Sequence, residues 1–338
     1  MLILEFGLPI VLVSLLSFAY RGAKPDFNDM GRVYRFRDGV WTPSPEIPGG
    51  AWRVRVSSRG DVWAVGTTRG GLNQLNGSGW THYGKAEFGA QSDWIRGGFA
   101  ISGEEVWGAT DAGAVRFDGQ SWHFYADALK TNKPASIVAR PTGVWIIDNY
   151  GNLSQFDGGR WTIRGLSAIL PGSRPRGGEE DSEPALSVTA DGRLWIVWRG
   201  VWLLDGKTWR EIRPEGVDLA QAWLIGHDPD SVWLWIRRTG EVVSLTAEGK
   251  IAARYRLRDM GLNGRINIGR LVAANGRIWL ATNAGLVAST GSGWKNFGLP
   301  PGCMAIRNVD LAPDGSAWVV GARRDLAQIL RDFGPPLA

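Results

Sequence analysis

A tryptophan recurs seven times along this 338-residue chain, each time after a turn-forming stretch and an apolar or small residue. The copies are RGDVW at Trp63, EEVW at Trp107, TGVW at Trp145, DGRLW at Trp195, DSVW at Trp233, NGRIW at Trp279 and DGSAW at Trp318. Their spacings of 38 to 50 residues match repeats that each form one four-stranded propeller blade. The chain also holds 47 glycines and only 4 methionines, which suits short strands joined by tight turns.

A second motif follows most copies after 14 to 17 residues and pairs a glycine-containing turn with another tryptophan. Its copies are NGSGW at Trp80, DGQSW at Trp122, DGGRW at Trp161, DGKTW at Trp209 and TGSGW at Trp294. In the fifth repeat Tyr255 stands near the expected position. Asn-Gly and Asp-Gly supply the positive φ that a tight hairpin needs. Each repeat therefore predicts strands A to D, with the first tryptophan in B and the second in D.

The two ends of the repeat region complement each other. The copy at Trp318 has no second tryptophan after it, whereas residues 33–36 and RDGVW at Trp41 form a second half without a first. We predict that the N-terminal strand closes the last blade, because joining both chain ends in one sheet removes the open edge. We expect residues 326–330 to form strand C there and residues 33–41 to supply at least the outermost strand. The fold class is thus all-β, a seven-bladed propeller of four-stranded antiparallel blades over residues 31–333, with residues 334–338 as a tail.

Residues 1–24 have a different character and predict a signal peptide or membrane anchor. Between residues 2 and 19 only Glu5 is charged, and Arg21 and Lys24 follow. A bilayer span needs ~20 apolar residues, so the segment is close to anchor length. Ser17 and Ala19 offer a small-x-small cleavage site. The positive charges after the segment favour a cytoplasmic C-terminal part instead, but we expect an extracytoplasmic protein, periplasmic or secreted, that residues 2–19 anchor if they are not removed.

Charge and motifs argue against several classes of function. The net charge of +5 and the pI near 9.5 come without a run of lysine and arginine, so we expect no nucleic-acid partner. Cys303 is the single cysteine and there are three histidines, with no HExxH, no His-x-His, no P-loop and no GxSxG. We therefore expect no cofactor, no metal site and no catalytic residues, although a lyase or glycosidase that uses a few carboxylates stays open.

Two stretches, DGRLWIVWRGVWLLDGKTW at residues 191–209 and GDVWAVGTTRGGLNQLNGSGW at residues 60–80, resemble the two-component-regulator propeller repeat. The resemblance covers residues 31–333. In that family such blades form the extracytoplasmic sensor part of hybrid histidine kinases and also occur in exported proteins without a kinase. The resemblance therefore implies a sensor module, which we expect to signal through a partner. Tectonin-type lectin propellers share the Gly-x-Val-Trp pattern and are a competing resemblance.

Ligand sites of propellers usually occupy the face that carries the B–C loops and the connections between blades. Arginine recurs in these loops, and a ring of guanidinium groups would suit an anionic ligand through bidentate contacts. A solvated polar rim is the alternative. Trp94, in the long connection GKAEFGAQSDWIRGG, is the most distinctive tryptophan outside the repeat, and Trp52, Trp198, Trp202, Trp223 and Trp235 are further candidates. The predicted ligand-binding residues are Arg69, Asn149, Arg199, Arg237, Asn283, Arg323 and Trp94.

These observations favour a non-catalytic exported or membrane-anchored propeller. We expect it to bind an anionic or carbohydrate ligand or a protein partner, with a sensor module as one form of that function. Two alternatives stay open: a carbohydrate- or peptide-active lyase or hydrolase with its site at the propeller funnel, and a tectonin-like lectin. The repeated tryptophans themselves are expected to pack between blades, because one indole per blade at one register is what a propeller core requires.

Overall fold

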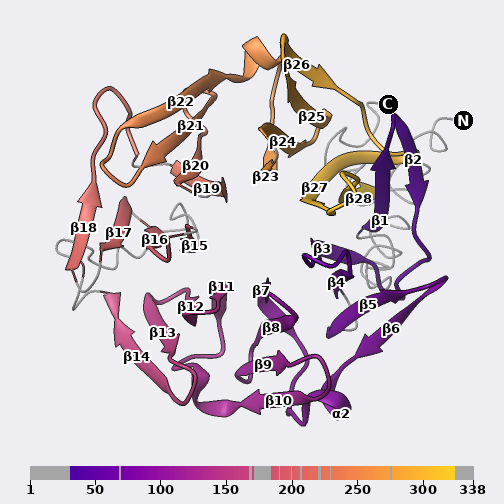
Figure 1. The fold of residues 1–338 in the computed structure, drawn as a ribbon, viewed down its shortest axis with the longest axis vertical. Helices are drawn as coiled ribbons and strands as arrows, with labels where there is room; N and C mark the ends of the chain where they lie inside the picture. The colour runs from indigo at the N-terminus through magenta and orange to yellow at the C-terminus, as the bar shows by residue number, and fades with distance from the viewer. Residues whose placement is uncertain are drawn as a thin grey trace, which may run out of the picture.

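Seven four-stranded antiparallel sheets form a closed ring around a central axis (Figure 1). The computed structural model describes residues 31–67, 70–166, 170, 184–189, 191–198, 200–205, 208–219, 222–228, 230–274 and 276–323. The predicted seven-bladed propeller is confirmed. No helix within these ranges is long and apolar enough to cross a membrane, and the predicted signal or anchor segment lies outside them.

Six blades are continuous in the sequence, with strands A, B, C and D in order from the axis outwards. The first three are β3 (Ala51–Val56), β4 (Val62–Gly66), β5 (Leu72–Asn76), β6 (Gly79–Tyr83); β7 (Ile95–Ser102), β8 (Glu105–Thr110), β9 (Ala114–Phe117), β10 (Trp122–Tyr125); and β11 (Pro134–Arg140), β12 (Gly143–Asp148), β13 (Asn152–Phe156), β14 (Trp161–Gly165). The next three are β15 (Ala185–Val188), β16 (Leu194–Val197), β17 (Val201–Asp205), β18 (Thr208–Ile212); β19 (Ala222–His227), β20 (Ser231–Ile236), β21 (Glu241–Thr246), β22 (Ile251–Arg256); and β23 (Ile268–Ala274), β24 (Arg277–Thr282), β25 (Gly285–Thr290), β26 (Gly293–Asn296). Short helices α2 (Lys85–Phe88), η2 (Ala126–Ala128) and η3 (Leu257–Met260) lie in connections between blades.

The seventh blade joins both ends of the ring. Its inner strands are β27 (Cys303–Leu311) and β28 (Ala317–Arg323), and its outer strands are β1 (Arg32–Arg37) and β2 (Val40–Pro43). Closure by the N-terminal part of the chain is therefore confirmed. The expectation that residues 326–330 supply strand C is wrong, because β1 pairs directly with β28 and occupies that position. Residues 326–330 themselves lie outside the described residues.

The hairpin of β1 and β2 shows why Asp-Gly marks the outer turns. Asp38 has φ +50° and Gly39 has φ +83°. A two-residue hairpin turn of this twist needs positive φ at both central residues, and aspartate and glycine tolerate it best. The turn brings Trp41 opposite Phe36 in the sheet, so the second tryptophan of the motif enters strand D as predicted.

The repeated tryptophans form the core between neighbouring blades. Six of the seven are at most 8% exposed, and Trp318 is partly buried. Trp63 of β4 packs against Trp122 and Phe117 of the next blade, with ring centroids 6.3 and 5.8 Å away. Trp107 meets Trp161 of the following blade in the same edge-on geometry at 6.2 Å. The predicted core role of these indoles is confirmed.

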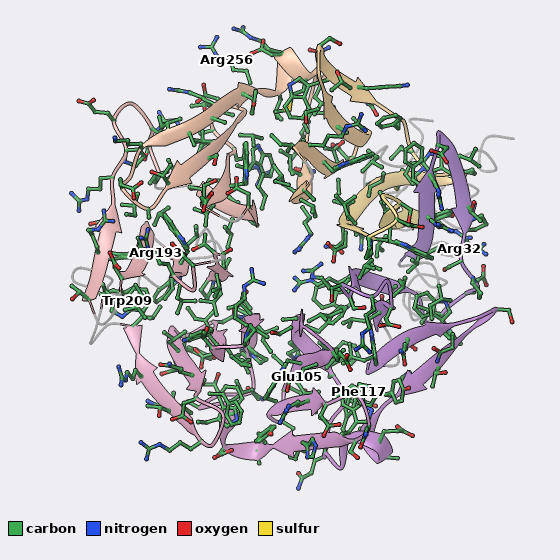
Figure 2. The ribbon with its side chains drawn as sticks, viewed as in Figure 1. Arg32, Glu105, Phe117, Arg193, Trp209 and Arg256 are labelled. Atoms are coloured by element: carbon green, nitrogen blue, oxygen red, sulfur yellow. The ribbon has the colours of Figure 1, made fainter. Side chains whose placement is uncertain are left out.

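Side chains fill the wedges between the blades, as Figure 2 shows. Phe117, labelled there, lies between the blade of β7–β10 and the blade of β3–β6, in agreement with its contact with Trp63. At the ring closure Phe36 of β1 packs against Phe297 and Trp279 of the preceding blade, with centroids 4.9 and 6.4 Å away. The closing blade therefore uses the same aromatic contact as the continuous ones.

Trp107→Ala should lower the free energy of unfolding by about 3–5 kcal/mol, because it removes a fully buried indole and leaves a cavity between two blades. Trp223→Ala removes an indole that is 44% exposed and should change it by less than about 1 kcal/mol. Urea unfolding followed by circular dichroism measures both values. Equal losses in the two variants would contradict a core role for the repeated tryptophan.

Asp314, in the turn between β27 and β28, ties the C-terminal hairpin to β1. Its Oδ1 accepts hydrogen bonds from the Ser316 hydroxyl and N–H at 2.6 and 3.0 Å, and its Oδ2 lies 2.5 Å from Arg35 and 3.2 Å from Arg37. The Ser316 hydrogen bonds and the Arg35 charge lower the pKa of Asp314 to about 2. Because this pKa is depressed in the folded state, the carboxylate stabilises the fold above its unfolded pKa of ~3.9. That contribution is lost as the pH falls towards 2.

Asp314→Asn should therefore lower the free energy of unfolding at pH 7. The loss should be no more than about 1 kcal/mol, because the carboxylate is solvent-screened. The difference should shrink between pH 4 and pH 2, the range that the depressed pKa sets. Asp38→Asn is the matched control, since the Asp38 side chain is 89% exposed and asparagine tolerates the same turn. A difference that persists unchanged at pH 2 would show that the carboxylate charge is not the cause.

Candidate functional site

The B–C loops and the starts of the A strands lie on one face of the ring, which we call the B–C face. In the first continuous blade, Ala51 at the start of β3 pairs with Gly66 at the end of β4. The same arrangement places Ile95 beside Thr110 and Pro134 beside Asp148. Loops from adjacent blades therefore meet here, as predicted for a propeller ligand site.

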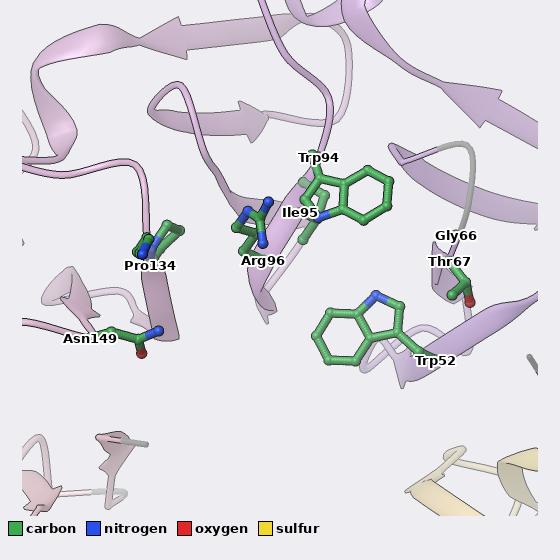
Figure 3. Close-up of a pocket in the computed structure, with 9 residues that line it drawn as sticks. Trp52, Gly66, Thr67, Trp94, Ile95, Arg96, Pro134 and Asn149 are labelled. Carbon is green, nitrogen blue, oxygen red and sulfur yellow. The ribbon is translucent and has the colours of Figure 1, made fainter. Parts of the chain in front are cut away.

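A cavity of about 440 Å³ opens on this face across the three blades that contain β3, β7 and β11. Its lining comes from the starts of A strands, the connections before them and two B–C loops: Trp52, Gly66, Thr67, Trp94, Ile95, Arg96, Lys133, Pro134 and Asn149. We call it the tryptophan cleft. Figure 3 shows Trp52 and Trp94 towards one side of it, Pro134 and Asn149 towards the other, and Arg96 between.

Two indoles of the cleft lie beside arginines. The Arg53 guanidinium sits 4.4 Å from the ring of Trp52, and the Arg96 guanidinium sits 5.8 Å from the ring of Trp94. Cations at such distances are attracted to the electron-rich face of an indole. Trp94 is nevertheless 40% exposed, so part of its ring faces solvent. The cleft thus combines open aromatic surface with positive charge.

The backbone holds Trp94 in this position. Its carbonyl oxygen accepts a hydrogen bond from the Asp111 N–H at 3.1 Å, and its own N–H donates to the Ser92 hydroxyl at 3.3 Å. Asp111 also lies 4.0 Å from the Arg96 guanidinium. The preceding helix α2 is anchored by Phe88, which is 2% exposed. A rigid connection therefore presents the exposed indole, which favours a preformed site over an adaptable one.

The opposite wall is built around the buried Asp148. Its carboxylate accepts hydrogen bonds from the N–H groups of Tyr150 and Asn152 at 3.0 and 2.8 Å and from the Thr131 hydroxyl at 2.8 Å. The loop that it shapes presents Asn149 to the cleft and Tyr150, 60% exposed, to solvent. This carboxylate is used for structure, because its oxygens are occupied by neighbouring donors.

The structure brings two of the seven predicted ligand-binding residues together, namely Trp94 and Asn149. Arg237 is exposed beside Trp235 in another blade, and Asn283 bonds to the backbone of Arg265 and Asn267. Arg323 lies in a separate cavity of about 220 Å³, where it is 3.7 Å from Glu46. Arg69 and Arg199 lie outside the described residues. Within the described residues, the predicted arginines do not converge on one site.

The additional tryptophan candidates fall into two groups. Trp198, Trp202 and Trp235 are each 5% exposed and belong to the core, which leaves little of their surface for a ligand. Trp52 lines the cleft, and Trp223 is 44% exposed on the same face. Sequence reasoning missed Arg96 and Lys133, which lie just inside or just before an A strand. The available signal was a basic residue next to the first residue of each of these strands.

Among the described residues, the lining of the tryptophan cleft has two cations, Arg96 and Lys133, and no aspartate, glutamate, histidine or cysteine. No group of three or more such residues that could hold a metal ion occurs in the described part of the chain. The cleft can offer indole faces, an amide and two positive charges to a ligand. Such a donor set is chemically suited to an anion with an apolar or ring-shaped body.

Comparison with known proteins places the fold but no family. No protein-family model and no curated protein matches the sequence. Among solved structures, a streptogramin B lyase is similar with a TM-score of 0.64 and 14% identity, over 86% of this chain and 95% of that one. YCF48 from Cyanidioschyzon merolae is similar with a TM-score of 0.55 and 16% identity, over 80% and 92% of the two chains.

A third similar structure is the extracellular domain of BT4673 from B. thetaiotaomicron, described as a hybrid two component system. Its TM-score is 0.57 at 15% identity, and the match covers 80% of this chain and 39% of that one. Identities of this size show a shared propeller fold and leave the function to the residues of the site.

Limited oxidation with N-bromosuccinimide should modify Trp94 and Trp223 before the buried indoles, because these two are 40% and 44% exposed. Trp107 and Trp195, at 1% and 0%, should react last. Peptide mapping by mass spectrometry gives the order of modification. Oxidation of Trp107 at the rate of Trp94 would contradict the placement of the cleft indole.

Proposed function

We propose that this protein is a non-catalytic, extracytoplasmic binding propeller whose ligand occupies the tryptophan cleft. The observation that carries the proposal is the combination of a 40% exposed indole with two cations in a preformed cavity across three blades. A concave site that combines exposed aromatic surface with a few convergent polar groups favours ligand binding. An anionic carbohydrate fits this surface best.

The chemistry of the lining supports that ligand class. The C–H face of a sugar ring packs on an indole, and Trp52 and Trp94 supply two such rings. A carboxylate on the sugar would meet Arg96, whose planar guanidinium suits bidentate contact, and Lys133 as a second charge. The Asn149 side chain adds both a donor and an acceptor for hydroxyl groups.

Binding without turnover is favoured over a lyase or hydrolase. Acid–base catalysis needs a side chain that exchanges a proton near the bound ligand, most often histidine or a carboxylate. The described lining of the cleft contains neither. A tectonin-like lectin would repeat a weak site in every blade, whereas this cleft joins three different blades in one cavity. A single site of this kind is the better account.

An extracytoplasmic sensor role is part of the proposal. Residues 2–19 are almost entirely apolar, which suits export or anchoring. Fold neighbours include extracellular domains, which agrees with the resemblance to the two-component-regulator propeller repeat. In this role ligand occupancy of the cleft would be read by a partner protein at the cell envelope.

Isothermal titration with trimers of galacturonate, glucuronate and mannuronate tests the ligand class, with the methyl ester of each trimer as the uncharged match. At least one acid should bind more tightly than its ester. Trp94→Ala should weaken that binding ~tenfold or more, since tenfold corresponds to ~1.4 kcal/mol. Arg96→Gln should weaken binding of the acid by ~10–100-fold, because charge-assisted hydrogen bonds contribute ~1.5–3 kcal/mol. Binding of the ester should stay unchanged.

Arg237→Gln is the control, since Arg237 is an exposed arginine in a B–C loop that lines neither the cleft nor the axial cavity. It should bind like the parent. Equal affinity for acid and ester would overturn the anionic ligand, and unchanged binding in Trp94→Ala would overturn the site. Mass spectrometry of the trimers after incubation with the protein detects turnover. Cleavage products would overturn the non-catalytic assignment.

A further inference from the structure

A second cavity of about 400 Å³ lies on the propeller axis, lined by the innermost strands of all seven blades. Within the described part of the chain, its charged lining consists of four arginines and a single acid: Arg53, Arg55, Arg140, Arg270 and Asp310. The excess of three positive charges is concentrated where the blades converge. None of its lining residues belongs to the tryptophan cleft.

Strand register places the charges at successive levels of this axial cavity. Arg55 of β3 is paired with Trp63, and Asp310 of β27 is paired with Trp318, so both stand at the level of the repeated tryptophan. Arg53, paired with Val65, stands two residues nearer the B–C face. The carboxylate therefore shares its level with only one of the arginines.

The other two arginines come from different blades. Arg270 of β23 is paired with Ala281, which also puts it two residues nearer the B–C face than the repeated tryptophan. Arg140 is paired with Gly143 and lies two residues towards the opposite face. Since β27 lies between β23 and β3 in the ring, Arg270 approaches from one side of Asp310 and Arg55 from the other.

The acceptors in the axial cavity are already used by the strand next to them. Asp310 Oδ2 accepts a hydrogen bond from the Val56 N–H at 3.0 Å. Asn308 Oδ1 accepts from the Val54 N–H at 2.9 Å and from the Arg55 guanidinium at 3.2 Å. These contacts satisfy the free edge of the innermost strand β3. The carboxylate therefore joins the closing blade to β3 and offsets only one of the four positive charges.

Electrostatics in the axial cavity leaves Arg55 and Arg270 short of counter-charge. Burial lowers the pKa of Arg55 well below its ordinary value, Arg270 and Arg53 lower it further by repulsion, and Asp310 opposes them. Burial likewise lowers the pKa of Arg270. The Arg270 Nε–H is buried and makes no hydrogen bond within the described residues. A buried donor of this kind costs stability until an acceptor reaches it.

Packing holds one of the arginines in place. The Arg53 guanidinium lies over Gly98 of β7, whose φ is +80° at an irregularity in that strand. A Cβ at residue 98 would overlap the guanidinium, so only glycine leaves the space. The positive φ of Gly98, which is unfavourable for other residues, thus makes room for the Arg53 guanidinium at the cavity wall.

We propose that the axial cavity is an anion site that takes a tetrahedral oxyanion, phosphate or sulfate, either as the free ion or as the monoester of a small organic molecule. A dianion offsets most of the charge excess, and its oxygens accept from guanidinium groups that approach from several directions. Isolated surface charges would be screened by salt, whereas partly buried charges, such as those that line this half-open cavity, are screened much less.

Isothermal titration at low ionic strength tests the proposal with inorganic phosphate, inorganic sulfate, glucose 6-phosphate and glucose 6-sulfate, and with glucose as the blank. The parent protein should show saturable binding of one oxyanion per chain. Arg270→Gln should weaken it at least tenfold. Binding of the esters alone identifies an organic carrier as the source of the anion, and binding of the inorganic ions identifies the free ion; either result supports the oxyanion site.

Two variants keep the test independent of folding defects. Asp310→Asn retains the oxygen that accepts from Val56 and removes the negative charge, so it should bind the oxyanion several-fold more tightly. Arg237→Gln changes an exposed arginine outside the cavity and should bind like the parent. Absence of saturable binding, equal affinity in Arg270→Gln and Arg237→Gln, or equal competition by chloride would overturn the proposal.

Discussion

The contact of each repeated tryptophan with the outer strands of the next blade is the interaction on which this structure depends. A four-stranded sheet cannot bury both faces alone, so each blade relies on its neighbours. In the pairs Trp63 with Trp122 and Trp107 with Trp161, the indoles meet edge-on at 6.3 and 6.2 Å. Such contacts add to the burial of large apolar area. Because the contact is sequential, one weak blade would loosen both of its neighbours, and the ring needs a closing blade.

Both ends of the described chain contribute strands to the blade that closes the ring. β1 and β2 complete the sheet of β27 and β28. Phe36 of β1 packs against Trp279 and so forms the aromatic contact with the preceding blade. The hydrogen bonds and ion pairs of Asp314 join the same two parts of the chain. Asn308 and Asp310 connect the closing blade to β3 on the inner side. Closure is therefore secured at the rim and at the axis by different chemistry.

The core residues repeat from blade to blade, whereas the residues of the two candidate sites do not. The tryptophan cleft takes its indoles and cations from only three blades, and the axial cavity takes its four arginines from three strands of different blades. Core positions must repeat because every blade interface has the same shape. Connections and the innermost strands are free of that requirement, so they can vary. The two candidate sites lie at those variable positions, and both have positively charged side chains in their described lining.

The sequence alone determined the architecture of this protein, because inter-blade packing requires an indole at one register in every repeat and glycine at the turns. That pattern predicted the blade count, strands B and D of each blade and closure through Trp41. It also predicted that Tyr255 replaces the second tryptophan in the fifth repeat. The site was only partly predictable: Trp94 and Asn149 meet in the cleft, whereas Arg237, Asn283 and Arg323 lie elsewhere. Only the tertiary structure brought Arg96 and Lys133 beside the indoles and Arg55 near Arg270 at the axis. The physical reason is that loop path and strand register set which side chains from distant blades converge, and neither leaves a periodic signal in the chain.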